Sequence, residues 1–159
     1  MEKLSLVLWQ ERDVMDTLLY RLEIEQLVLA SGRSDRLMRA AQEVDATLQA
    51  MRETEVLRAT AAAEAAESLG LPYDVPLREL AERADEPWRT TLLDHHEVFT
   101  TTLRRLVELA DANRHLLTQG YQSARETLMH LAGQQPESYS QDGSAVTASP
   151  GSQLVDWSV

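Results

Sequence analysis

One long amphipathic stripe dominates the C-terminal half of the chain. Between residues 85 and 132, apolar or small side chains recur at alternating gaps of three and four, which places them along one side of an α-helix. The stripe consists of Leu92, Phe99, Leu103, Leu106, Ala110, Leu117, Tyr121, Ala124, Leu128 and Leu131. A helix over this segment extends for about 70 Å.

Two other segments, residues 4–31 and 35–69, also predict long helices. At the same rise per residue they extend for only about 40 and 50 Å. The other two helices are therefore too short to cover the whole apolar face of the third. An apolar face without an internal partner indicates a binding surface.

The composition favours helices throughout the folded part. The 159 residues are rich in Ala, Leu, Glu and Arg, which are strong helix formers. No run alternates with period two, and Asp142-Gly143 is expected to lie in a tail without flanking strands. We predict an all-α fold. It is an antiparallel, coiled-coil-like bundle of three long helices, with a short helix between the second and third and a disordered C-terminal tail.

Glycines mark the ends of the predicted long helices, because glycine readily closes a helix C-terminus. They are Gly32, Gly70 and Gly133. Ser34 or Asp35 is expected to cap the second helix. Asp85 is expected to cap the third, over residues 86–132, with Pro87 in its first turn.

The tight joint at Gly32 predicts an antiparallel hairpin of the first two helices. Its predicted seam comprises Leu8, Met15, Leu18, Leu22 and Leu29 against Leu37, Ala41, Val44, Leu48 and Met51. Beyond Met51 the same register meets Glu55 and Arg58, so we expect the seam to weaken there. After an extended connector, Pro76 opens a short helix over residues 77–83.

From residue 134 the chain consists of Gln, Ser, Gly, Pro, Thr and acidic residues with few apolar ones, and it contains no Lys or Arg. Such a segment buries too little apolar surface to offset its ordering entropy. We predict a helical domain over residues 1–133 and a flexible tail over residues 134–159. The terminal cluster at residues 154–159, with Trp157, is either an irregular end or a short docking motif.

Candidates for chemistry are few. All four histidines fall on the third predicted helix: His95, His96, His115 and His130. We place His96 on the apolar stripe and expect the histidines to face solvent or the core rim, without metal. No His pair has i,i+4 spacing, and no Glu lies three residues before a His. Phosphate-binding glycine loops, nucleophile elbows and cysteines are absent from the sequence. We predict a protein without enzymatic activity or cofactor.

The net charge of −11 disfavours nucleic acids and anionic membrane surfaces as partners. The charge either serves solubility alone or suits an acidic carrier that holds an aggregation-prone client. No signal-peptide core and no apolar run of membrane-spanning length occurs, so we expect a cytoplasmic protein.

Two residues interrupt the long stripe. Asn113 either fixes the register between helices or lies at the edge of the seam. Gly120, in a helix interior, either permits a close helix approach or a bend, or is merely tolerated. Tyr121 carries a hydroxyl group that requires water or a partner.

Three segments resemble the FlgN family of flagellar export chaperones. They are residues 8–13 (LWQERD), residues 22–33 (LEIEQLVLASGR) and residues 109–117 (LADANRHLL), the last of which resembles the family's A-x-x-N-x-x-L-L stretch. The similarity covers about residues 8–131.

The resemblance implies a type III secretion chaperone without enzymatic activity or cofactor. Its clients are the hook-associated proteins that join hook to filament. Such a chaperone binds the client's aggregation-prone terminal helix, keeps the client monomeric and delivers it to the export apparatus. The family's client site on the C-terminal helix corresponds here to Leu103, Leu106, Ala110, Asn113, Leu117, Tyr121, Ala124 and Leu128.

Two other classes of function are compatible with the helical pattern. In a structural coiled-coil subunit, the surplus stripe of the third helix pairs with a second copy of itself. A helical-bundle metalloenzyme is disfavoured by the spacing of the histidines.

Overall fold

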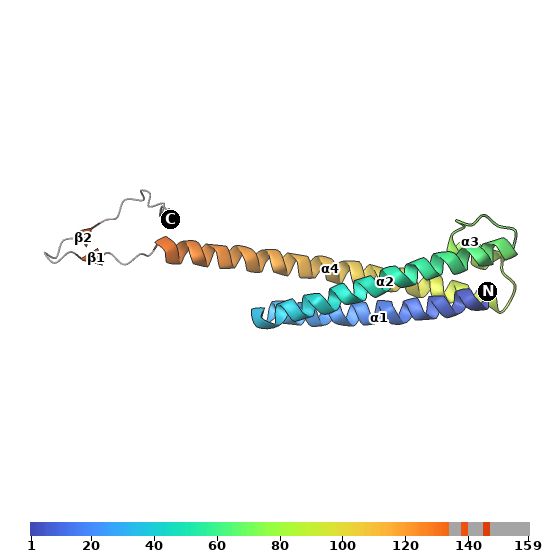
Figure 1. Ribbon diagram of the computed structural model, residues 1–159, viewed down its shortest axis with the longest axis horizontal. Coiled ribbons are helices and arrows are strands. Elements are labelled where there is room, and N and C mark those ends of the chain that lie inside the picture. The colour runs from blue at the N-terminus through green and yellow to red at the C-terminus, as the bar shows by residue number, and fades with distance from the viewer. Residues whose placement is uncertain (134–137, 140–144, 147–159) are drawn as a thin grey trace, which may run out of the picture. The chain divides into compact units, whose positions relative to one another are not determined.

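The computed structural model describes residues 1–133, 138–139 and 145–146. Its helices are α1 (Glu2–Ala30), α2 (Ser34–Ser68), α3 (Leu77–Arg83) and α4 (Trp88–Gly133), as labelled in Figure 1. The predicted all-α fold of three long helices, with a short one before the last, is confirmed, and the predicted bounds lie close to those observed.

The chain divides into two compact units, Met1–Gly120 and Tyr121–Val159. In the second unit, β1 (Ser138–Tyr139) pairs antiparallel with β2 (Ala145–Val146). The expectation that no strand flanks Asp142-Gly143 is therefore wrong, because strands of 2 residues are too short to give an alternating pattern. The division at residue 133 stays a prediction. The rest of the tail, with the cluster at 154–159, lies outside the described residues.

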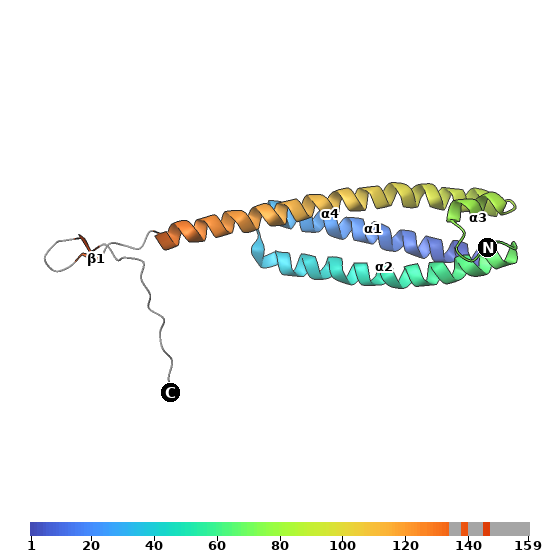
Figure 2. The ribbon, with the colours of Figure 1, turned by 90° about the horizontal axis from the view of Figure 1, so that it is seen from above.

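The long helices of the first unit alternate in direction. Helix α2 runs antiparallel to α1 and to α4, as Figure 2 shows from above. Contacts of α1 with α4 follow the same order along both helices, from Arg12 with Asp94 to Leu22 with Asn113, so these two helices are parallel.

The core of this unit consists of two clusters. One joins the start of α1, the end of α2, α3 and the start of α4: Leu4, Leu8, Ala61, Ala65, Ala66, Leu80, Ala81, Ala84 and Leu92. The other lies farther along α1 and α4: Met15, Leu18, Leu22, Val44 and Leu106. The expected weakening of the seam beyond Met51 is wrong. The small alanines of α2 pack there against leucines of α1 and α3.

The rest of the predicted hairpin seam is largely correct. Leu8, Met15, Leu18, Leu22 and Val44 are buried, and Leu29, Leu37, Leu48 and Met51 are partly buried. Ala41 is exposed, and Ala40 takes the buried position. Neighbouring residues of an α-helix point about 100° apart. An error of one residue in the predicted register therefore places Ala41 on the buried side of α2 in place of Ala40.

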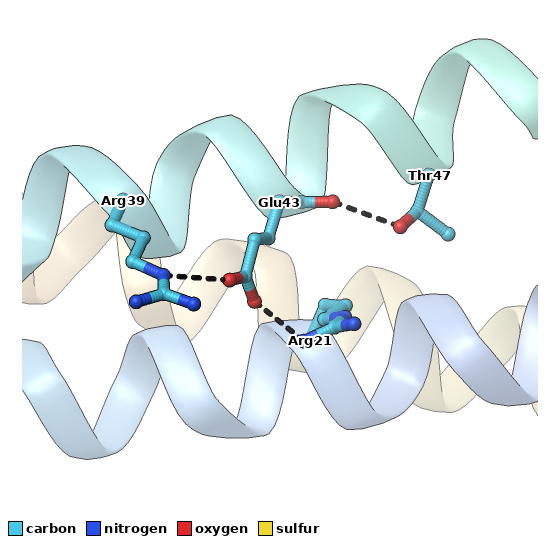
Figure 3. Close-up of polar contacts among 4 residues, drawn as sticks. All are labelled: Arg21, Arg39, Glu43 and Thr47. Atoms are coloured by element: carbon cyan, nitrogen blue, oxygen red, sulfur yellow. Dashed lines mark hydrogen bonds and ion pairs between the residues drawn. The ribbon is translucent and has the colours of Figure 1, made fainter.

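A polar contact supports the register of the hairpin on its outer side (Figure 3). The Glu43 carboxylate on α2 accepts hydrogen bonds from Arg21 of α1 and from Arg39 one turn earlier on α2. The Thr47 hydroxyl donates to the Glu43 carbonyl at 2.8 Å. These groups are partly exposed, so each ion pair contributes no more than about 1 kcal/mol.

The predicted helix caps are corrected. The N-cap residue of α2 is Arg33, without a side-chain capping bond, and Ser34 is already the first residue of the helix. At the start of α4, Thr90 N–H donates to the Glu86 carboxylate rather than to Asp85. Gly133 is the last residue of α4, not the residue after it.

Replacing Gly32 or Gly120 by alanine should change the stability of the protein in opposite directions. Gly32 has a φ of +67°, which strains any residue with a Cβ, so Gly32→Ala should lower the free energy of unfolding by about 1 kcal/mol. Gly120 lies inside α4 with nothing within 4 Å of an added Cβ, which excludes a close helix approach at this residue. Gly120→Ala should stabilise the helix by about 0.5–1 kcal/mol.

Urea denaturation measures the effect at Gly32, and amide hydrogen exchange of the neighbouring α4 residues measures the effect at Gly120. A stabilising Gly32→Ala would contradict the strained turn.

Candidate functional site

The segments at residues 22–33 and 109–117 meet through a buried amide. Asn113 of α4 is 2% exposed, and its Nδ2 donates to the Leu22 carbonyl and to Glu25 Oε2, both at 2.9 Å. Glu25 of α1 is also buried. Asn113 therefore lies inside the α1–α4 interface, and the alternative at the edge of the seam is wrong.

The segment at residues 8–13 contributes a second buried polar contact, this one to α2. Glu11 is 5% exposed, and Arg58 Nε donates to its Oε1 at 3.1 Å. Burial raises the pKa of Glu11, and the Arg58 charge opposes this shift. The position predicted to weaken the seam thus holds an ion pair between α1 and α2.

The same segment contacts α4 through Trp9 and Arg12. Arg12 Nη1 donates to Asp94 Oδ2 at 2.9 Å, and its guanidinium lies 4.4 Å from the centre of the Trp9 ring. The Trp9 ring packs edge-on against His95, with centroids 5.0 Å apart. His95 is fully buried, which corrects the prediction that it faces solvent or the core rim and that His96 occupies the stripe.

The buried imidazole of His95 should make stability dependent on pH. Burial, with Arg12 beside the ring, lowers the pKa of His95, and Asp94 partly opposes this. The unfolded chain then takes up a proton near pH 6.5 that the folded chain does not. Stability should therefore be full above about pH 6.5 and fall as the pH decreases below it.

Urea denaturation between about pH 7.5 and 5.5 tests this, with His95→Gln as the comparison. The variant should show a flatter dependence over this range. Glu11 changes the stability in the opposite direction at lower pH. Because its pKa is raised in the folded state, the folded chain binds a proton more readily than the unfolded chain, and acidification favours folding. An equal slope in both proteins would contradict the role of His95.

A groove lies between α2 and α4, with α1 as its floor and Leu77 of α3 beside it. Its volume is about 760 Å³. We call it the α2–α4 groove; it is lined by Glu11, Met15, Met51, Glu55, Arg58, Leu77, His96, Phe99, Thr100, Leu103, Arg104, Val107 and Glu108. Leu103 and Val107 are each more than half exposed, so large apolar side chains face solvent here.

The structure separates the predicted partner-binding residues into buried and exposed ones. In the first unit, Leu106 and Asn113 are buried, Ala110 is half-buried, and Leu103 and Leu117 are exposed. In the second unit, every α4 residue over 121–133 is exposed, so the predicted positions there all face solvent: Tyr121, Ala124 and Leu128.

Three exposed large apolar residues of α4 were missed by the sequence analysis: Leu93, Val107 and Met129. Val107 follows Leu103 by one helical turn, and this i,i+4 spacing is the signal that could have found it. Met129 is next to Leu128 in sequence and lies outside a strict stripe.

Within the described ranges, no group of three or more His, Asp or Glu side chains is placed to hold a metal ion. None of the described helices is long and apolar enough to cross a membrane.

Comparison with known proteins places these segments in a family. Residues 1–147 match the FlgN protein family, a range that includes all three segments described above. No curated protein and no solved structure matches the chain. The resemblance found in the sequence is thereby confirmed. The chain belongs to the FlgN family, the non-enzymatic flagellar export chaperones of hook-associated proteins.

Proposed function

We propose that this chain is a cytoplasmic chaperone that binds the aggregation-prone terminal helix of a hook-associated protein. It keeps this client monomeric and delivers it to the flagellar type III export apparatus. The family supplies the class of client. The observation that supports the mechanism most is the solvent exposure of large apolar side chains on α4, with Leu128 67% exposed.

The exposed residues of the second unit have the spacing by which one helix contacts another. Tyr121, Ala124, Leu128 and Leu131 follow one another at intervals of three, four and three residues, and all are exposed. A client helix covering about 600 Å² of apolar surface gains roughly 15 kcal/mol of hydrophobic free energy, before the costs of association and ordering are subtracted. Association and ordering offset most of it, which leaves micromolar to nanomolar binding.

The first unit adds exposed α4 residues to the proposal. Leu103 and Leu117 face solvent and are proposed as client contacts. Leu106, Ala110 and Asn113 are proposed to act indirectly, by holding α4 against α1, since they are buried or half-buried. The net charge of −11 opposes self-association of a chain with this much exposed apolar surface.

Leu128→Asp tests the proposal. Because it places a charge within the exposed apolar face, it should weaken the binding of hook-associated proteins at least about 100-fold. The helical circular-dichroism signal should be unchanged. Leu117→Asp is the corresponding variant in the first unit, and Gln122→Asp, on an exposed polar position of α4, is the control.

Titration calorimetry with each purified hook-associated protein measures the affinity. Amide exchange should show residues 121–131 protected only with client. Binding of Leu128→Asp at wild-type affinity, or full protection of this segment in the free protein, would contradict the proposal.

A structural coiled-coil subunit is the second candidate, since the same exposed face of α4 could pair with a second copy. Sedimentation across concentrations distinguishes the two. A tight dimer that client does not dissociate would favour the coiled-coil subunit.

A further inference from the structure

Two buried titratable side chains, Glu11 and His95, take part in the contacts of α1 with its neighbours. Glu11 of α1 is bonded to Arg58 of α2. Arg12, the next residue of α1, contacts Asp94 and His95 of α4. The first contact therefore joins the two helices of the hairpin, and the second joins α4 to the hairpin. Neither includes a residue of the proposed client-binding face.

The hydrogen-bonding positions of the His95 ring suit a neutral imidazole. Its Nδ1 lies 3.5 Å from Arg12 Nη1. Because a guanidinium group only donates, Nδ1 can only accept there, and the single ring proton is on Nε2. Nε2 is buried and has no hydrogen-bond partner in the described part of the chain. A second ring proton would lie on Nδ1, where it faces a positively charged donor instead of an acceptor.

The charges around the ring also oppose an imidazolium. Arg12 of α1 and Asp94 of α4 are the charged groups that act on His95, and α2 and α3 contribute none among the described residues. Asp94 already accepts a hydrogen bond from Arg12, and its side chain is 60% exposed, so solvent screens its attraction. The Trp9 ring, edge-on to His95, already has the Arg12 guanidinium 4.4 Å from its centre. A positive charge on His95 therefore disfavours this contact.

Glu11 responds to acid in the opposite way. Its Oε2 is buried and accepts no hydrogen bond in the described part of the chain. Protonation removes a buried charge, although it weakens the ion pair with Arg58. Burial outweighs the ion pair and raises the pKa of Glu11. Acid therefore disfavours the contact of α1 with α4 without disfavouring the contact of α1 with α2.

We propose that Trp9, Arg12, Asp94 and His95 form an acid-sensitive switch: protonation of His95 releases the start of α4 from α1, while the α1–α2 hairpin stays closed. In the released state the imidazole is exposed to water and has a pKa near its ordinary value of about 6.5. The released fraction should rise about 3–10-fold between pH 7.5 and 5.5, because the released state takes up a proton that the closed state resists.

Amide hydrogen exchange of the full chain tests the switch, since it reports the opening of each helix separately. After correction for the intrinsic pH dependence of exchange, protection of the α4 amides over residues 92–99 should fall about 3–10-fold between pH 7.5 and 5.5. Protection of the α2 amides over residues 58–66, which border the same core cluster, should fall less or not at all. Nitrogen chemical shifts of the His95 ring should show its proton on Nε2 at pH 7.5. These comparisons use the unmodified chain.

Variants then identify the residues responsible. His95→Gln should remove most of the pH dependence of the α4 amides, and Arg12→Gln should reduce it by removing the charge beside Nδ1. Arg105→Gln is the matched control and should leave it unchanged. The ion pair of Arg105 with Glu23, at 3.9 Å, also joins α4 to α1, but Arg105 lies about three turns along α4 from His95.

Three results would each overturn the inference. A ring proton on Nδ1 at pH 7.5 would mean that the imidazole does not accept from Arg12. An equal fall of protection in α2 and α4 would mean that the bundle opens as a whole. An unchanged pH dependence in His95→Gln would assign the effect to another group.

Discussion

Replacing Leu92 by alanine should lower the free energy of unfolding of the unit Met1–Gly120 by about 2–5 kcal/mol. Leu92 is 0% exposed and lies in the core cluster that joins α4 to leucines of α1 and α3. Alanine removes the part of the side chain that fills this space. The cavity lies where α1, α2, α3 and α4 meet, so no single element can move to fill it. Urea denaturation followed by circular dichroism measures the change.

Leu93 provides the matched control. It is the next residue in the same turn of α4 and is 37% exposed, so Leu93→Ala removes the same atoms from a position that is partly in contact with water and leaves no closed cavity. Its effect should be less than about 1 kcal/mol. Equal effects of the two substitutions would contradict the burial of Leu92 and the direction of the α4 face.

The helix bounds were predictable because the signals that set them are local. Gly32 and Gly70 both have a φ of +67°, a conformation in which glycine is favoured, and each follows a long helix. Pro76 precedes α3, which begins at the predicted residue. A residue's own backbone preference was sufficient in these places.

The inward face of α4 was harder to predict. The structure buries Leu92, His95, Leu106 and Asn113, which fit a seven-residue repeat. The predicted stripe places His96 instead of His95 on the inward face, and its other residues follow a slightly different line along the helix surface. A helix of 3.6 residues per turn drifts by about 20° per seven residues relative to such a repeat, so one line cannot serve all 46 residues.

The partners of the polar residues could not be predicted from the sequence at all. Nothing local indicates that Glu11 meets Arg58 or that Glu25 meets Asn113, since each pair joins distant segments. The candidate client-binding positions show the same limit. Periodicity alone placed Leu103 and Leu106 together, although one is exposed and the other buried.

The segments that carry the family resemblance therefore have a structural explanation. Residues 8–13 contact α2 and α4, and residues 22–33 contact residues 109–117 through Glu25 and Asn113. These contacts set the register of the three helices. The exposed face proposed to bind clients lies largely outside these segments. The three segments that resemble the family are therefore explained by packing within the bundle more directly than by client binding.

Replacing Asn113 by leucine should lower the free energy of unfolding by about 2–3 kcal/mol, because Glu25 then stays buried without its amide donor. The effect should exceed that of Asp111→Leu, on an exposed position of the same helix. Urea denaturation measures both.

The double variant Asn113→Leu with Glu25→Leu distinguishes a lost partner from poor packing. When both members of a buried polar pair become apolar, no unpaired group is left, so most of the lost stability should return. The coupling free energy in this double-mutant cycle should be at least about 1 kcal/mol. If the two substitutions instead add, the amide does not depend on Glu25. Asn113 would then hold α4 against α1 through the Leu22 carbonyl alone.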